Sequence, residues 1–167
     1  MPTEVFRATD ATLVLAADDS QSAEGTAAGA LIMQYDLSNA VGRLSNVRLA
    51  VTSDVQPFYE IGRRYPAALR PGLVAVTGSA ERAHINGALL RLLLGEGASS
   101  PPATPVFAQP AFNAVATLRD VAQPDAFAKV TAFGVRFDSW SYNLGVAGDF
   151  VLESVTFQAM RLTYEEA

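Results

Sequence analysis

Three groups of polar residues in this chain have types that can do chemistry: one histidine, two pairs of adjacent carboxylates and a cluster of arginines. A general base at His84 would need a nucleophile and an orienting carboxylate close by, and no motif supplies them. The pairs Asp18–Asp19 and Glu165–Glu166 lie in a predicted loop and at the chain end, where solvated charge is the simpler interpretation. Nucleophile-elbow, phosphate-binding, dinucleotide-binding and zinc motifs are all missing from the sequence. We therefore predict no catalytic residue, no metal site and no cofactor.

The arginines lie in the densest basic feature, Gln56–Gly72, which also carries aromatics, prolines and glycines. Loops of this length in a small domain are often functional, and arginine and tyrosine are enriched at interface centres. Five residues are candidates for a subunit interface: Tyr59, Arg63, Arg64, Tyr65 and Arg70. The alternative is a loop whose charge only promotes solubility. Because the whole chain has a net charge of -5, a second copy of itself is a credible acidic partner.

Composition limits the class of protein. The chain has 167 residues, of which 50% are hydrophobic and 17% charged, so we predict a single globular domain over residues 1–167. There is no cysteine, which rules out disulfides and thiolate metal sites. No apolar run reaches the roughly 20 residues that span a bilayer, and the first residues lack a secretion signal, so we expect no membrane association and cytoplasmic folding. The net negative charge gives no support to nucleic-acid binding through a basic face.

The sequence of one segment, Val74–Gly97, predicts a short strand followed by a helix with a clear start and a clear end. Ser79 is the expected N-cap and Gly95 the expected end of the helix. Apolar residues recur at helical spacing and predict a buried face: Ile85, Ala88, Leu89, Leu92 and Leu93. Such a helix needs a sheet to cover.

Most of the remaining chain reads as strands. We predict strands in Ala11–Ala16, Leu31–Leu37, Val47–Ser53, Leu73–Thr77, Ala111–Val121, Lys129–Asp138 and Phe150–Tyr164. The last is too long for one strand, so a bulge is expected near Glu153 and Ser154, and a slip is expected near Ala132. Ala16–Ala30 and the proline-rich Gly97–Pro110 read as loops, and Trp140 and Tyr142 as turn residues. The predicted fold is mainly β with one helix: a β-sandwich or squashed barrel with a flanking helix.

Short motifs in two regions together resemble a known family. They are Glu60-Ile61-Gly62, Pro71-Gly72, Thr77-Gly78-Ser79, Ile85-Asn86 with its leucine-rich continuation, and the C-terminal FVLESVTFQAMRLTYEE. This order is similar to that of the tail tube proteins of contractile-tailed bacteriophages and related phage-tail-like particles. The resemblance covers about Gln56–Gly95 and the last 18 residues of the chain.

The resemblance implies a structural role. Subunits of this family form hexameric rings that stack into a hollow tube for DNA or effectors, which pass without specific binding. It also implies sheath, baseplate and tape-measure proteins as partners, and a place in the virion tail after assembly in the host bacterial cytoplasm. Sharing strands between subunits removes exposed sheet edges, and an acidic protein repels passing phosphates.

The expected channel lining comes from one face of two predicted strands. Those strands are Leu31–Leu37 and Val47–Ser53, and the candidate lining residues are Gln34, Asp36, Arg48 and Thr52. Arg48 would need a carboxylate partner such as Asp36, because a lysine or arginine that faces DNA slows its passage. A second hypothesis is a monomeric or dimeric β-sandwich that binds a sugar or peptide through Trp140, Tyr142 and nearby loops. A hydrolase with an unrecognised site has the least support.

Overall fold

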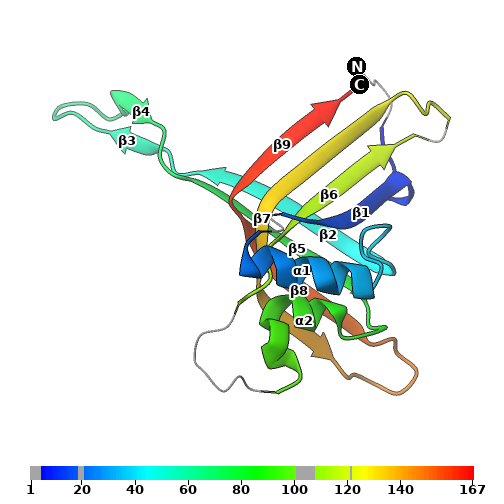
Figure 1. Ribbon diagram of the computed structural model, residues 1–167. Helices are drawn as coiled ribbons and strands as arrows, with labels where there is room; N and C mark the ends of the chain where they lie inside the picture. Colours follow the sequence, from blue (N-terminus) through cyan, green and yellow to red (C-terminus); the bar gives the residue numbers. More distant parts are fainter. Residues whose placement is uncertain (1–4, 19–20, 101–107, 121) are drawn as a thin grey trace.

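The computed structural model describes residues 5–18, 21–100, 108–120 and 122–167. Figure 1 shows a curled antiparallel sheet, two helices on one side of it and a hairpin that projects away from the body. The strands of the described chain are β1 (Ala11–Ala17), β2 (Leu44–Ser53), β3 (Gln56–Phe58), β4 (Ala68–Arg70), β5 (Val74–Ala83), β6 (Phe112–Arg119), β7 (Phe127–Asn143), β8 (Leu152–Ala159) and β9 (Arg161–Glu166). The helices are α1 (Ala23–Gln34) and α2 (Ala88–Leu94), with short 3-10 turns η1 (Ala8–Asp10) and η2 (Gly95–Ala98).

The long strand β7 joins two halves of one seven-stranded sheet, ordered β1-β6-β7-β8-β5-β2, with β9 also paired to β7. Its first part pairs with β6 and β9, and its second part pairs with β8. We call β1, β6, β9 and the first part of β7 the β6 half, and β2, β5, β8 and the second part of β7 the β8 half. The strand turns between them at Gly134, whose φ of 64° suits glycine, and at a bulge near Asp138.

The core lies between the inner faces of the two halves and the two helices. α1 contributes Ala28 and Ile32, and α2 contributes Leu89 and Leu92, all buried. The sheet meets them with buried aromatic and branched side chains from β6, β7 and β8: Phe112, Val135, Phe137, Val155 and Phe157. Phe112 and Phe137 pack edge to face with ring centroids 5.1 Å apart. The mainly β class predicted from the sequence is confirmed, with a second helix added.

The sequence predicted a loop and then a strand in residues 16–37, and these predictions are wrong for the residues that follow the end of β1 at Ala17. The predicted loop and the strand over residues 31–37 are instead α1 and the turn that follows it. The Ser22 side chain caps the helix by accepting a hydrogen bond from Gly25 N at 3.0 Å. Gly25 and Ala28 are buried, so the small residues that suggested a mobile loop are the ones that let the helix approach β1.

The helix predicted after Thr77 starts later than expected. β5 continues to Ala83, and α2 begins at Ala88 after Gly87, so Ser79 is a strand residue and not a cap. Ile85 lies before the helix and is 55% exposed, which corrects its assignment to the core. The expected end of the helix is confirmed at Gly95, which has a φ of 59°.

The C-terminal segment breaks at Met160, between β8 and β9, and not near Glu153. Glu153, Val155 and Phe157 alternate as buried residues without a change of phase, so the predicted bulge on β8 is wrong. Trp140 and Tyr142 belong to β7 and not to a turn. The slip expected near Ala132 is confirmed by the register shift between β6 and β7. Half of the predicted connector over residues 97–110, namely residues 101–107, lies outside the described residues, and its first residues belong to η2.

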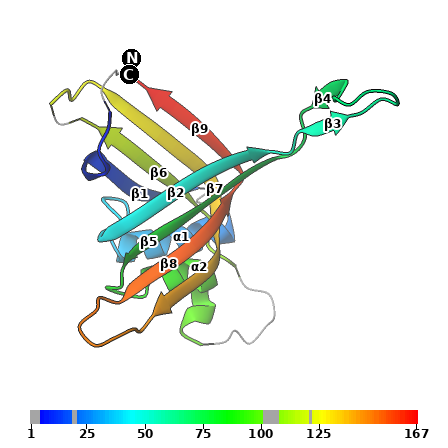
Figure 2. The same cartoon turned by 180° about the vertical axis from the view of Figure 1, so that it is seen from behind.

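Residues 54–73 form a projecting hairpin, which we call the arm. β2 and β5 run out of the body side by side and continue into the short strands β3 and β4 (Figures 1 and 2). Asp54 N donates to Leu73 O at 2.9 Å at the base, and Ala67 N donates to Phe58 O at 2.8 Å further out. The irregular connection predicted for residues 56–72 is therefore an extended hairpin with a looped tip.

Candidate assembly surfaces

One face of the β8 half is polar and carries no core residue. The strand register aligns Arg48, Ser79, Thr156 and Ser139 in one row across the four strands. Hydroxyls bond to each other across β7 and β8, with Ser139 Oγ 2.6 Å from Thr156 Oγ1 and 3.0 Å between the Ser141 and Ser154 hydroxyls. Figure 2 shows that no helix covers this face. We call it the polar face.

Charges on the polar face are few and mixed. Asp138 accepts hydrogen bonds from the Thr156 hydroxyl and, at 3.2 Å, from Gln158 Nε2. Glu81 accepts from Ser45 Oγ at 2.9 Å. The cation on this face is Arg48 of β2, whereas Arg136 forms an ion pair at 3.9 Å with Glu24 of α1. Such a surface of hydroxyls and few charges of mixed sign offers a passing molecule neither an apolar patch nor a strong electrostatic attraction.

Two strand edges border the polar face and have no neighbouring strand in the described chain. β2 pairs with β5 alone, and residues 138–143 of β7 pair with β8 alone. Unpaired edges of this length are templates for another chain. Each successive pair across the β8 half is antiparallel, so β2 and β7 run in opposite directions. A β2 edge from another copy can therefore extend the sheet at β7 in the same antiparallel sense.

The arm brings all five interface candidates predicted from the sequence into one element. Tyr59 and Tyr65 are 60% and 84% exposed, and Ile61 at the tip is fully exposed. Arg63 forms an exposed ion pair with Glu60 at 3.5 Å, which contributes little stability. A hairpin with strands of three residues is marginally stable alone, so a partner surface would stabilise the arm.

The four predicted lining residues do not share one surface. Arg48 and Thr52 lie on the polar face with Ser79 and Ala75 as their partners on β5. Gln34 ends α1, and Asp36 lies in the next turn, where its φ is 55° and its side chain accepts from Asn39 Nδ2 at 2.8 Å. Their expected place on a sheet face is wrong, because residues 23–34 are helical.

The sequence reading missed a buried polar cluster around Glu153. This carboxylate is 0% exposed and accepts hydrogen bonds from Arg82 Nε at 2.6 Å, His84 Nδ1 at 3.1 Å and Trp140 Nε1 at 2.9 Å. His84 also stacks on Tyr142, with 5.8 Å between the rings. Trp140 and the 47% exposed Tyr142 thus lie on β7 and do not form the loop platform that the binding-module hypothesis required. The only sequence signal was one charged residue amid the alternating apolar residues of β8.

Three further observations complete the description of the chemical groups. No group of three or more histidine or acidic residues suited to hold a metal is found in the described ranges. Within the same residues, no helix is long and apolar enough to cross a membrane. At the end of β9, the Tyr164 hydroxyl donates to Glu166 Oε2 at 3.0 Å, and this hydrogen bond raises the pKa of Tyr164.

Comparison with known proteins assigns the fold to the tail tube class. No protein-family model and no curated protein matches the chain in sequence. In structure the chain is similar to one from the PVC sheath-tube complex of an extracellular contractile injection system, with a TM-score of 0.63 and 9% identity over 99% of this chain and 94% of that one. It is also similar to the SPP1 tail tube protein, with a TM-score of 0.61 and 11% identity over 98% and 80%.

A third similar structure is a chain in the tail of an empty GTA particle with C6 symmetry, with a TM-score of 0.53 and 10% identity over 96% and 99%. The fold that the sequence motifs resembled is therefore confirmed, across almost the whole chain and at very low sequence identity.

Proposed function

We propose that this chain is the structural subunit of a phage or phage-tail-like tail tube, in which hexameric rings stack into a hollow tube. The observation that carries the proposal is the polar face bounded by two free edges. A sheet with one polar face and two unpaired edges is stable in water once copies join edge to edge. The whole-length similarity to tail tube chains supports this reading, and the C6 symmetry of the GTA tail supports the hexamer.

In the proposed ring, β2 of one copy pairs with residues 138–143 of β7 in the next. Repeating this step keeps the polar face on one side of a continuous sheet, because antiparallel pairing preserves the alternation of side chains. That face becomes the channel wall and carries Arg48 and Thr52, as expected from the sequence, together with Thr77, Ser139 and Thr156. DNA or an effector passes along it without specific binding.

The opposite side of each subunit carries both helices and faces outward in this arrangement. A surface made of α1 and α2 is then available for binding a sheath. The end of the tube is available for binding a baseplate. A tape-measure protein would occupy the channel during assembly. The protein would lie in the virion tail after assembly in the host bacterial cytoplasm, with no catalytic step and no cofactor.

The arm supplies contacts that the edges do not. Its exposed tyrosines and arginines project beyond the body, where only another subunit can bury them. Edge pairing closes a ring, whereas stacking needs a contact that leaves the ring. We assign that second contact to Tyr59, Arg63, Arg64, Tyr65 and Arg70.

Electron microscopy of the purified protein at rising concentration tests the proposal. Rings with a central hole, and tubes of stacked rings at higher concentration, are the expected result. Uniform small particles at every concentration would favour a monomeric or dimeric binding protein instead.

A further inference from the structure

A recess of about 460 Å³ lies at the bend of β7, where the β8 half of the sheet meets the β6 half. It opens beside the free edge of β7, next to the point where residues 138–143 begin. Side chains from α2, β7, β8 and the junction of β8 with β9 line it, and they include Leu93, Arg136, Phe137, Asp138, Gln158 and Met160. We call it the bend recess.

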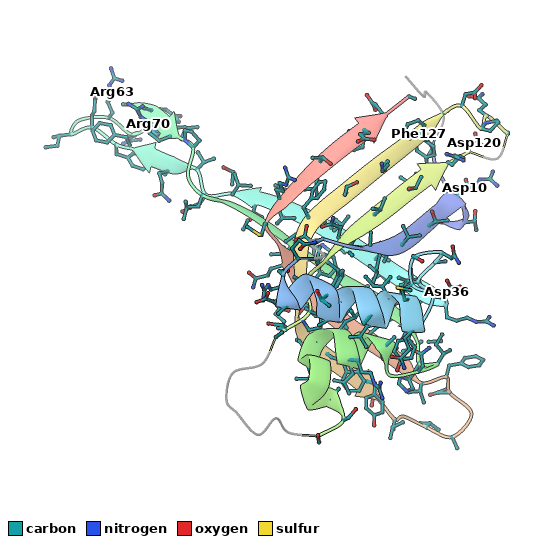
Figure 3. The ribbon with its side chains drawn as sticks, in the orientation of Figure 1. Asp10, Asp36, Arg63, Arg70, Asp120 and Phe127 are labelled. Carbon is teal, nitrogen blue, oxygen red and sulfur yellow. The ribbon has the colours of Figure 1, made fainter. Side chains whose placement is uncertain are left out.

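Strand direction determines which part of the next copy reaches this recess. In the proposed ring, β2 of the next copy pairs antiparallel with residues 138–143 of β7, and β7 runs away from the bend along that edge. The end of that β2, at Ser53, therefore lies at the bend, and the arm of the next copy begins beside the bend recess. Figure 1 shows the base of the arm and the bend at the same end of the β8 half, and Figure 3 places Arg63 and Arg70 further out along the arm. The part of the arm that meets the recess is thus its base and not its tip.

We call Asp54, Val55 and Leu73 at this base the arm root. Within one copy, β5 and β8 lie between β2 and β7, so Asp54 is separated from Arg136 by three strand spacings, roughly 14 Å. Contact between these two side chains must therefore join different copies.

Charge favours that contact. Asp54 is exposed and forms no ion pair within the described residues. Arg136 is 49% exposed, and its 3.9 Å separation from Glu24 is the longest of the ion pairs in the same residues, so its guanidinium can take a second carboxylate. The acid at the recess, Asp138, already accepts hydrogen bonds from two side chains of β8. The free cation of the recess thus matches the free acid of the arm root.

Apolar side chains on both surfaces add area to the contact. Val55 and Leu73 of the arm root are 47% and 85% exposed, and Met160 at the recess is 85% exposed. Met160 lies over Gly134, where an added Cβ would be only 2.9 Å from its side chain. Contact between copies would remove these apolar groups from water.

We propose that the arm root of one subunit seats in the bend recess of the adjacent subunit of the same ring, with Asp54 paired to Arg136 and Val55 and Leu73 packed on Met160. The contact rests on the proposed tube and deepens it, because it sets the register of the ring. Two polar-faced edges that pair through the backbone alone can slip by two residues and keep every side chain on its face. An ion pair at one end of the paired edges prevents that slip.

Cysteine cross-linking tests the register, because the chain has no cysteine of its own. The double variant Thr52→Cys with Asp138→Cys places each thiol two residues from one member of the proposed ion pair, at exposed positions on the polar face. A disulfide needs Cα atoms about 5.5 Å apart, so oxidation reports close contact. We expect oxidised tubes to give dimers to hexamers on a non-reducing gel, because the contact closes within one ring. Multimers larger than six would place the contact between rings and overturn the proposal.

The matched control is Thr52→Cys with Asn143→Cys, since Asn143 is exposed at the other end of the same β7 edge, roughly 16 Å from Asp138. This pair should give no multimers. Tubes that form while the Thr52–Asp138 pair gives no multimers would overturn the contact and leave the tube standing. Failure of the unmodified protein to form rings or tubes at any concentration would overturn both.

Charge exchange tests the ion pair itself. Asp54→Arg and Arg136→Asp each place like charges together, and each should raise the concentration needed for tube formation by about tenfold. The double variant Asp54→Arg with Arg136→Asp restores opposite charges and should assemble near the concentration that the unmodified protein needs. Assembly of the double variant that is no better than that of the single variants would overturn the pairing of Asp54 with Arg136.

Discussion

Arg82 and Glu153 form a buried ion pair across β5 and β8, with Arg82 Nε 2.6 Å from Glu153 Oε1 and side-chain exposures of 1% and 0%. Arg82 Nη2 also donates to Asn86 Oδ1 at 3.0 Å, and the same oxygen accepts from Ala88 N at 3.1 Å. The pair thus links two strands of the β8 half to the first turn of α2. This cluster fixes the end of the proposed channel wall that lies away from the arm.

Removing one partner should destabilise the subunit strongly. Arg82→Met leaves the Glu153 carboxylate buried without its charge partner, and we expect a loss of about 3–5 kcal/mol in the free energy of unfolding. Urea denaturation of the unassembled subunit measures it. The control is Arg63→Met, which breaks an exposed pair and should change stability by less than about 1 kcal/mol. Similar small losses in both variants would contradict the structural role given to the buried pair.

The apolar face of α2 offers a second test. Leu89 is 2% exposed, so Leu89→Ala should leave a cavity and cost about 2–5 kcal/mol. Ile85 is 55% exposed and precedes the helix, so Ile85→Ala should cost less than about 1 kcal/mol. Thermal unfolding of both variants measures and compares the two losses of stability. Equal losses would mean that Ile85 is core, as helical spacing alone had predicted.

That contrast illustrates what local patterns could and could not predict. Apolar spacing correctly identified Leu89 and Leu92 as core, because the period of a helix is a local property. It failed over residues 79–83, where Ala80 and Arg82 face inward in β5. An inward arginine fits a strand only because Glu153 lies opposite, 71 residues away in the sequence. Pairing at that distance leaves no trace in a local pattern.

The helix α1 was missed for a related reason. Its segment holds small residues, which were interpreted as having nothing to bury. Ala28 is fully buried, and a Cβ added at Gly29 would be in ordinary contact, at 3.8 Å, with the Ala17 Cβ of β1. The small side chains thus permit close packing, which depends on a partner that the segment itself does not reveal. Alanine-rich composition and Ser22 were the available signals for a helix.

The placement of the candidate residues could be predicted in part. One element carries all five arm residues, since they are neighbours in sequence, and their role at an interface stays a prediction. The channel candidates lie on two different surfaces of the molecule. The sequence predicted a strand at Gln34 from a short apolar run that fits a helix equally well. The free edges of β2 and β7 could not be inferred, because edge position depends on the order of strands in the sheet.

Charge reversal in the arm should block assembly without unfolding the subunit. Arg63→Glu with Arg64→Glu replaces two exposed cations by acids, so the tip is repelled by the acidic surface of the next copy. We expect a folded, soluble subunit that forms no tubes when observed by electron microscopy. Arg63→Lys with Arg64→Lys keeps the charge and should retain tubes. Normal tubes from the glutamate variant would exclude these arginines as a required contact.

The central claim is that the polar face lines a channel. The most direct measurement is the rate of thiol labelling at Thr52→Cys and Thr77→Cys, compared between free subunits and assembled tubes, with Gln34→Cys on the helix side as the control. A reagent too bulky for the channel should label Thr52→Cys and Thr77→Cys rapidly in free subunits and slowly in tubes, and a small reagent should label them in both. Gln34→Cys should stay reactive to the bulky reagent in tubes. Equal labelling of Thr52→Cys and Thr77→Cys by the bulky reagent in both states would show that this face does not line the channel.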